Sequence, residues 1–387
     1  MDWMLECSQC GAATEPSGSD TVCTACGAPY LVRYERPKPA AALRDTFARR
    51  PQTMWRYREL LPIAAGEEPV SLDEGGTPLL RARRLGAELG LADVWIKDEA
   101  ANPTGSFKAR GLAAAITRAK AAGATRFVLP TAGNAGVAAA AYGARAGTTV
   151  RVYAPRTTPE PLLARMAAYG AEVVTIDGHI GDCGKLAGTY AVETLAVNLS
   201  TLREPYRIEG KKTLGLEIAE QLGWNLPGAI IYPAGGGVGL IGMWKAFKEL
   251  IAAGWVTGPM PRLFAVQSTG CAPVVRAVEQ QAKAVEPWQN PWTVASGLRV
   301  PGPLGGALML RGIRESSGWA VAVTDDELTA GAALMSRLEG VDCCPEGGAS
   351  VAAARKLTQA GRLAPDDRLV VFNTGAGVLY GRRFGSG

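Results

Sequence analysis

Histidine is nearly absent from this sequence, in which His179 is the only one among 387 residues. Mechanisms that pair a serine or cysteine nucleophile with a base use an imidazole for that base. Such mechanisms are therefore excluded unless His179 takes part. If it does not, any acid-base chemistry of the chain must come from other groups.

Long apolar runs are absent as well. The most apolar window, residues 228–244, is interrupted by Pro233 and several glycines, and it falls short of the roughly 20 residues that a membrane-spanning helix needs. The first residues show no basic segment followed by an apolar stretch, which a secretory signal would have. We therefore expect a cytoplasmic protein that has no membrane partner.

Charge of one sign is in only small excess, because 41 basic and 36 acidic residues are interspersed and give a net charge of +5. Residues 1–35 are acidic overall, with five acidic residues against Arg33 as the only basic one. Since nucleic acids attract basic surfaces, no nucleic-acid partner is expected.

The residues that are abundant are those of a globular α/β protein. The chain is 47% hydrophobic and 20% charged, with 48 glycines. Its length exceeds what one hydrophobic core usually holds, which predicts two lobes and a small appendage.

Four of the eight cysteines form two pairs, Cys7 with Cys10 and Cys23 with Cys26, and each pair is separated by two residues. Four thiolates at this spacing can close a tetrahedral zinc site. Residues 1–35 are therefore predicted to be a zinc-ribbon-like unit with one structural zinc. The other cysteines lie among apolar neighbours and are interpreted as core residues: Cys183, Cys271, Cys343 and Cys344.

From residue 70 onward, strand-like apolar runs alternate with Ala-rich helical segments, which predicts parallel sheets covered by helices on both faces. We expect an α/β fold of two doubly wound lobes, the larger formed by 70–107 and 196–387 and the smaller by 108–195. Residues 36–69 are interpreted as a linker, rich in proline and basic residues at 36–39, and a helical arm at 45–61. Later elements are predicted as helices at 209–222, 325–339 and 348–359 and strands at 229–232, 263–266 and 369–372.

A tight turn at 102–107 precedes Lys108, which stands at the start of a predicted helix. An amine beside the positive end of a helix dipole, with Arg110 nearby, loses its proton more readily than a solvated amine. Because the neutral amine condenses with aldehydes, Lys108 is predicted to be a point of covalent attachment.

Three loops follow predicted strands, where α/β sheets bind ligands. The loop 130–136 offers N–H groups to a carboxylate, and its Asn134 can donate to a phenolic oxygen. The glycine loop, residues 235–239, has consecutive amides that can wrap a phosphate. Thr374, in the loop 373–377, can offer its hydroxyl to a ring nitrogen.

The glycine loop also fits a dinucleotide-binding fingerprint through Gly237, Gly239 and Gly242, which leaves a nicotinamide-dependent enzyme as an alternative. That fingerprint is accompanied by an acidic residue after the next strand, where this chain has Gln267. The phosphate-binding interpretation is therefore favoured.

Lys108 in NPTGSFKARG, TAGNAG at 131–136, the glycine loop and NTGAG at 373–377 occur in the order and spacing of the fold type II pyridoxal-phosphate enzymes. Over residues 70–380 the chain resembles that group. Within it the chain is most similar to the threonine synthase family, because residues 204–213 resemble that family's RxEGxKT stretch and some members carry an amino-terminal cysteine unit. The resemblance implies pyridoxal 5'-phosphate as the cofactor.

The resemblance also implies a role for each matching residue. Lys108 would form the Schiff base and move protons, Thr374 would face the pyridine nitrogen and Arg207 would bind a substrate phosphate. The other implied cofactor contacts are Phe107, Asn134, Gly235, Gly236, Gly237, Val238 and Gly239, and the other implied substrate contacts are Thr131, Ala132, Gly133 and Ala135.

The implied reaction converts O-phospho-L-homoserine and water to L-threonine and phosphate by γ-elimination and β-addition, in a homodimer. Some positions differ from the commonest pattern of the family. Ala109 stands where the family often has an acidic residue after the lysine. Ala135 and Gly136 replace hydroxyl residues in the substrate loop, and Thr201 and Leu202 replace an Asn-Ser pair. These differences keep open another fold type II enzyme, such as a threonine/serine dehydratase or a β-replacement enzyme of the cysteate synthase kind.

Overall fold

The computed structural model describes residues 2–18, 20–35 and 41–380, and the predicted linker at 36–39 lies outside them. The chain divides into two compact units, each with its own sheets. Unit 1 comprises Met1–Gly76 and Lys108–Thr213, and unit 2 comprises Thr77–Phe107 and Leu214–Gly387. In the described part of the chain, no helix has the length and apolar character needed to span a membrane.

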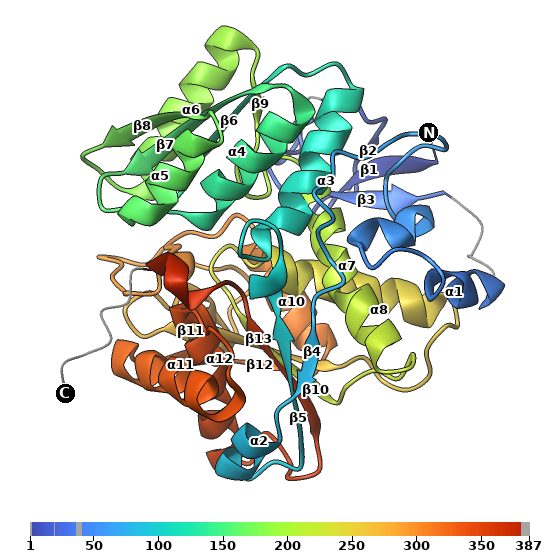
Figure 1. Cartoon of the computed structure of the whole chain (residues 1–387), viewed down its shortest axis with the longest axis vertical. Coiled ribbons are helices and arrows are strands. Elements are labelled where there is room, and N and C mark those ends of the chain that lie inside the picture. Colours follow the sequence, from blue (N-terminus) through green and yellow to red (C-terminus); the bar gives the residue numbers. More distant parts are fainter. Residues whose placement is uncertain (1, 19, 36–40, 381–387) are drawn as a thin grey trace. The chain divides into compact units, whose positions relative to one another are not determined.

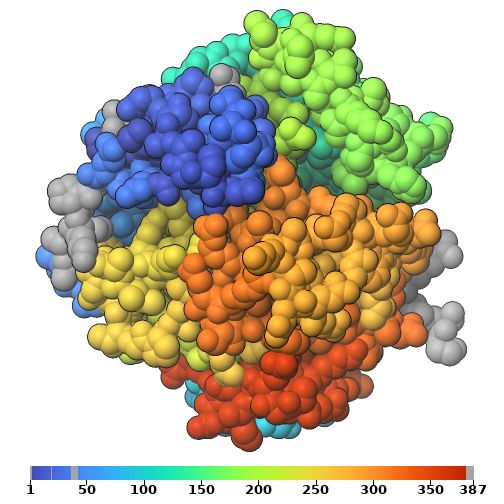
Figure 2. Space-filling model, turned by 180° about the vertical axis from the view of Figure 1, so that it is seen from behind, coloured from blue at the N-terminus to red at the C-terminus, as the bar shows by residue number. Residues whose placement is uncertain are grey.

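Unit 1 begins with a small antiparallel sheet in the order β2-β1-β3, made of β1 (Trp3–Cys7), β2 (Ala13–Thr14) and β3 (Tyr30–Tyr34). Its residues form the dark-blue group of atoms in Figure 2. The arm after it consists of α1 (Ala41–Phe47) and a 3-10 helix, η1 (Met54–Leu60), instead of one continuous helix. Pro51 lies between them and cannot donate a helical hydrogen bond, which accounts for the break.

The second sheet of unit 1 is parallel, in the order β8-β7-β6-β9. Successive residues of a strand face opposite sides of a sheet. Val128 accordingly packs with α6 on one side, whereas Val150 lies against Gly143 of α4 on the other, and Figure 1 shows helices on both faces. The elements are β6 (Arg126–Pro130), β7 (Thr149–Pro155), β8 (Glu172–Ile176), β9 (Val197–Asn198), α3 (Lys108–Ala121), α4 (Asn134–Ala146), α5 (Glu160–Ala168) and α6 (Ile180–Thr194).

Unit 2 contains a six-stranded sheet in the order β12-β11-β10-β13-β5-β4, in which only the edge strand β4 runs antiparallel to its neighbour. The core on one face joins Ile231 and Val371 of the sheet to Leu328 and Ala353 of α11 and α12, which are orange in Figure 1. The strands are β4 (Leu79–Arg81), β5 (Asp93–Asp98), β10 (Ala229–Pro233), β11 (Arg262–Ser268), β12 (Trp319–Val323) and β13 (Arg368–Asn373). The helices are α2 (Arg83–Leu89), η2 (Glu99–Ala101), α8 (Val238–Ala252), α9 (Pro273–Glu279), η3 (Ser296–Leu298), α10 (Gly306–Glu315), α11 (Asp325–Glu339), α12 (Pro345–Gln359) and η4 (Gly377–Tyr380).

The helix α7 (Tyr206–Gln221) begins in unit 1 and ends in unit 2. It starts three residues before its predicted first residue, Glu209. The predicted α/β class, with two doubly wound and mostly parallel sheets, is confirmed. The predicted domain boundaries remain a prediction.

Candidate active site

Three of the predicted segments meet at one edge of the unit 2 sheet. The turn at 102–107 follows β5, the glycine loop follows β10 and the loop 373–377 follows β13. These strands are neighbours in the order β10-β13-β5 and run parallel. Their carboxyl ends therefore share the edge at which α/β sheets bind ligands.

Backbone contacts fix the turn at 102–107 to the loop 373–377. The Phe107 N–H donates to the Thr374 carbonyl at 3.0 Å, and the Ala376 N–H donates to the Gly105 carbonyl at 2.9 Å. The Tyr232 ring, near the end of β10, lies edge-on to the Phe107 ring with centroids 6.0 Å apart. The residue that precedes Lys108 is thus held beside the loop 373–377 and the end of β10.

The glycine loop has no room for side chains. A Cβ on Gly235 would lie 2.1 Å from the Gly297 carbonyl oxygen, and one on Gly239 would lie 2.0 Å from the Tyr232 hydroxyl. Gly237 has φ +76° and its Cβ would lie 2.1 Å from a methionine sulfur. The loop leads into α8, whose first turn has no acidic residue. Backbone amides at the start of a helix whose first turn has no acidic residue suit a phosphate.

Thr374 is buried next to a cysteine that the sequence interpretation assigned to the core. Its Oγ1 lies 3.6 Å from the Cys344 Sγ, which also accepts the Gly347 N–H at 3.2 Å at the start of α12. Burial raises the pKa of the Cys344 thiol to about 12, so it stays neutral. The only sequence signal for this position is its place before Pro345, because proline is common at the first position of a helix.

In unit 1, Lys108 opens α3 and its side chain is half-buried. Two glycines let α3 approach the start of α7. A Cβ on Gly111 would lie 3.2 Å from the Arg207 carbonyl oxygen, and one on Gly210 would lie 2.1 Å from the Arg110 carbonyl oxygen. The helix that begins with Lys108 and the helix that carries Arg207 are therefore in backbone contact.

Arg207 is buried, with 2% of its surface exposed. Its Nη1 donates to the Leu199 carbonyl at 2.8 Å and to the Thr201 hydroxyl at 3.4 Å, whereas its Nε has no hydrogen-bond partner among the described residues. A buried donor without a partner is costly. Because Arg207 lies beside the helix of Lys108, this Nε could donate to an anionic ligand at this place.

Glu204 lies next to Arg207 and ends the loop before α7. Its Oε2 accepts the Tyr206 N–H at 2.8 Å and the Arg207 N–H at 3.0 Å. Burial raises the pKa of Glu204 to about 7, although the Arg207 charge and these two donors oppose the rise. Its carboxyl therefore changes charge near neutral pH, a property that sequence inspection missed.

The loop 130–136 follows β6 and opens α4. The Thr131 hydroxyl accepts the Gly133 and Gly136 N–H groups, both at 3.0 Å, so it holds the loop in shape. A Cβ on Gly136 would lie 2.7 Å from the Met166 sulfur and 2.7 Å from the Thr131 methyl group, so a side chain there requires these neighbours to shift. Asn134 and Ala135 are half-buried in the first turn of α4.

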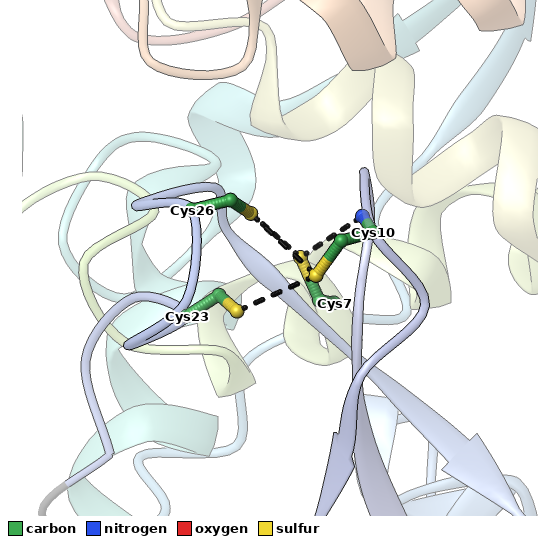
Figure 3. Close-up of side chains that lie close together, drawn as sticks. All are labelled: Cys7, Cys10, Cys23 and Cys26. Atoms are coloured by element: carbon green, nitrogen blue, oxygen red, sulfur yellow. Dashed lines mark hydrogen bonds between the residues drawn. The ribbon is translucent and has the colours of Figure 1, made fainter.

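The four paired cysteines form one cluster in the ribbon, and their sulfur atoms all lie within 4.8 Å of one another. Figure 3 shows the side chains pointing toward a common centre. The Cys7 and Cys26 sulfurs are 3.4 Å apart, and those of Cys10 and Cys23 are 3.7 Å apart. Tetrahedral zinc, with bonds of about 2.3 Å, places its sulfur ligands about 3.8 Å apart. The cluster has the ligands and spacing that zinc requires.

Residues 70–375 match the family described as "Pyridoxal-phosphate dependent enzyme". The chain is 34% identical over 377 residues to the threonine synthase of Methanocaldococcus jannaschii, a match that covers 97% of this chain and 92% of that protein. It is 35% identical to the threonine synthase of Mycobacterium leprae, with coverage of 85% and 88%. A coverage of 97% leaves out fewer residues than the ribbon contains, so the first of these matches extends into the ribbon.

Solved structures share the fold. Maize serine racemase matches with a TM-score of 0.69 at 22% identity, covering 78% of this chain and 88% of that one. The processed form of threonine deaminase isoform 2 from Solanum lycopersicum matches with a TM-score of 0.66 at 22% identity, covering 78% and 83%. These likenesses agree with the fold of type II that the sequence predicted.

Proposed function

This chain belongs to the family of pyridoxal-phosphate-dependent enzymes, and from that premise we propose that it converts O-phospho-L-homoserine and water to L-threonine and phosphate. Relatives named threonine synthase support this proposal over nearly the whole chain. The observation that carries it is Arg207, a buried guanidinium beside the helix of Lys108, whose Nε has no partner in the described part of the chain. A guanidinium suits a substrate phosphate because its planar fork can hold two phosphate oxygens.

Pyridoxal 5'-phosphate, when bound, supplies an electron sink that stabilises negative charge on the substrate carbons. In this proposal Lys108 holds the cofactor covalently, and the glycine loop binds its phosphate. Asn134 would contact its ring hydroxyl, and Thr374 would contact its ring nitrogen. The residues fit such a group, because the glycine loop excludes side chains and because the buried Ser106 hydroxyl, two residues before Lys108, has no hydrogen-bond partner among the described residues.

Each protein group has a separate role in the proposed reaction. The Lys108 amine takes and returns protons at the substrate carbons. The N–H groups of the loop 130–136 bind the substrate carboxylate at the positive end of α4. Arg207 orients the phosphate and stabilises its charge as the carbon-oxygen bond breaks. A neutral hydroxyl such as that of Thr374 would leave the ring nitrogen of the bound cofactor unprotonated, which would favour elimination.

A threonine or serine dehydratase is the second candidate. It is favoured by the substrate loop, where Ala135 and Gly136 provide no hydroxyl group and a side chain at residue 136 would meet Met166. The two candidates differ in their products. Phosphate release from O-phospho-L-homoserine, measured beside 2-oxo acid formation from threonine and serine, separates them. Ready deamination of threonine or serine without phosphate release would reject the synthase proposal and support the dehydratase proposal.

We also propose that the cysteine cluster binds one structural zinc, because its four thiols leave no position for a substrate. Metal analysis of the reduced protein should give about one zinc per chain, and finding none would reject the site. The cytoplasmic location, the homodimer and the absence of a nucleic-acid partner remain predictions from the sequence.

A further inference from the structure

The two ends of the paired strands β1 and β3 in the ribbon make different contacts. In the paired strands β1 and β3, Cys7 lies opposite Tyr30 at one end, and Trp3 lies opposite Tyr34 at the other. The first end carries the cysteine cluster. The side chains at the second end reach other parts of unit 1, so the strand pair connects the cluster to the rest of the unit.

Tyr34 completes a buried charge network on α7. Its hydroxyl donates to the Glu209 Oε2 at 2.5 Å, and Glu209 pairs with Lys212 at 2.7 Å with both side chains fully buried. The Lys212 ammonium also donates to the Tyr34 hydroxyl at 3.2 Å and to the Leu60 carbonyl at 2.5 Å, and it lies 4.3 Å from the centre of the Tyr34 ring. All three ammonium donors are therefore used inside the network. Lys212 is thus engaged by the ribbon and is not available to a substrate phosphate.

The network lies on the first two turns of α7, which also carry Arg207. A buried ion pair tolerates the loss of a partner poorly, because the remaining charge is left uncompensated. Tyr34 therefore restricts the position of this part of the helix. Since α7 contacts α3 through backbone atoms at Gly111 and Gly210, a small displacement of α7 changes the distance between Arg207 and Lys108.

The ribbon contacts α3 as well. The Trp3 ring is buried and lies 4.9 Å from the Arg118 guanidinium carbon, and Arg118 pairs with Glu67 at 2.6 Å. A Cβ on Gly18 would lie 2.0 Å from the Ala122 Cβ. The ribbon therefore touches the helix of Lys108 and the helix of Arg207.

We propose that Tyr34 is a positioning residue through which the ribbon fixes the start of α7, and with it the affinity of Arg207 for the phosphorylated substrate. This inference rests on the proposed function. Metal in the cysteine cluster holds the far end of the same strand pair. Metal loss should therefore loosen the start of α7 and raise the KM for the substrate, while cofactor binding by the unit 2 loops persists.

Tyr34→Phe in the full-length holoenzyme tests the inference, because it keeps the ring and removes only the hydroxyl. Tyr169→Phe is the control, since the Tyr169 hydroxyl likewise accepts a hydrogen bond from a basic side chain, that of Arg165, but at an exposed position. Hydrogen exchange of residues 206–213 should be faster in Tyr34→Phe by about tenfold, as expected for a lost hydrogen bond to a charged group. The KM for O-phospho-L-homoserine should rise by about tenfold, with kcat, cofactor absorbance and metal content unchanged.

Chelation of the metal from the wild-type protein gives a second reading that needs no variant. It should produce the same faster exchange at 206–213, and it should add little to the exchange of Tyr34→Phe. Unchanged exchange and unchanged KM in Tyr34→Phe would overturn the inference even if the wild type releases phosphate from O-phospho-L-homoserine. If the wild type releases none, the proposed function fails, and the exchange data still decide whether Tyr34 positions α7.

Discussion

Two parts of the proposed site are held in place in different ways: the cofactor-binding segments of unit 2 and the segment of unit 1 that is proposed to bind the substrate phosphate. In unit 2, glycines pack directly against neighbouring backbone, as Gly235 does against Gly297, and Phe107 bonds to Thr374 through main-chain atoms. In unit 1, Arg207 stands between buried ionisable side chains, Glu204 before it and the Glu209–Lys212 pair after it. The first region should respond mainly to changes of shape, and the second to changes of charge.

Lys108 directly follows the turn at 102–107 of unit 2 and opens α3 in unit 1. Its loss should therefore have the largest effect. Lys108→Ala should lower activity by about a hundred- to ten-thousandfold, because the amine is the proposed acid-base group. It should also lose the visible absorbance that borohydride otherwise fixes to the protein. Fixation of the cofactor to a different lysine in the variant would contradict this assignment.

Glu204 tests whether charge governs the unit 1 segment. Its pKa is raised from 4.5 to about 7, so the folded state keeps a proton that the unfolded chain loses over this range. The stability of the fold should therefore fall as pH rises through that window, by up to about 3 kcal/mol from this group.

Glu204→Gln should remove this pH dependence, since the amide oxygen can still accept the Tyr206 and Arg207 N–H groups. Denaturant midpoints measured at about pH 5 and about pH 8 provide the test. The variant should gain stability over the wild type at the higher pH. Equal differences at both pH values would show that the carboxyl titrates normally.

Arg207 tests the same segment through the substrate. Arg207→Met should lower kcat/KM for O-phospho-L-homoserine by about ten- to a hundredfold, as expected for hydrogen bonds to a charged group, and should hardly affect an unphosphorylated amino acid. Arg203→Met is the control, because Arg203 lies in the same segment and is exposed. An equal loss with both substrates would make Arg207 a structural residue.

Gly235 tests whether shape governs the unit 2 segments. In Gly235→Ala the new Cβ meets the Gly297 carbonyl oxygen, so overpacking should cost about 1–3 kcal/mol and weaken cofactor binding. Gly302→Ala is the control, because a Cβ there meets no heavy atom within 4 Å. Thermal unfolding with and without cofactor measures both effects, and identical behaviour of the two variants would refute the packing argument.

The same contrast explains what the sequence could predict. Segments held by backbone appear as glycine and proline patterns next to apolar strands, and the structure places the glycine loop and the loop 373–377 at the expected strand ends. The helix α11 (Asp325–Glu339) has its predicted bounds because Thr324 and Glu327 form a capping box at its start. The local sequence was sufficient to predict these loops and this helix.

Side-chain networks could not be predicted in this way, because their members are distant in the chain. Tyr34 and Glu209 are separated by 175 residues, and neither position has a distinctive local pattern. Cys344 was interpreted as a core residue, and it is buried as expected, but its place beside Thr374 depends on how α12 and β13 pack. Single-sequence patterns contain no information on such pairings.

The most direct test of the central claim follows the oxygen atoms when O-phospho-L-homoserine is converted in water enriched in oxygen-18. In the proposed reaction the carbon-oxygen bond to phosphate breaks and water adds at the neighbouring carbon. Mass spectrometry should therefore find one oxygen-18 atom in the threonine hydroxyl and none in the released phosphate. Label in the phosphate, with homoserine as the other product, would show cleavage of the phosphorus-oxygen bond and would contradict the account.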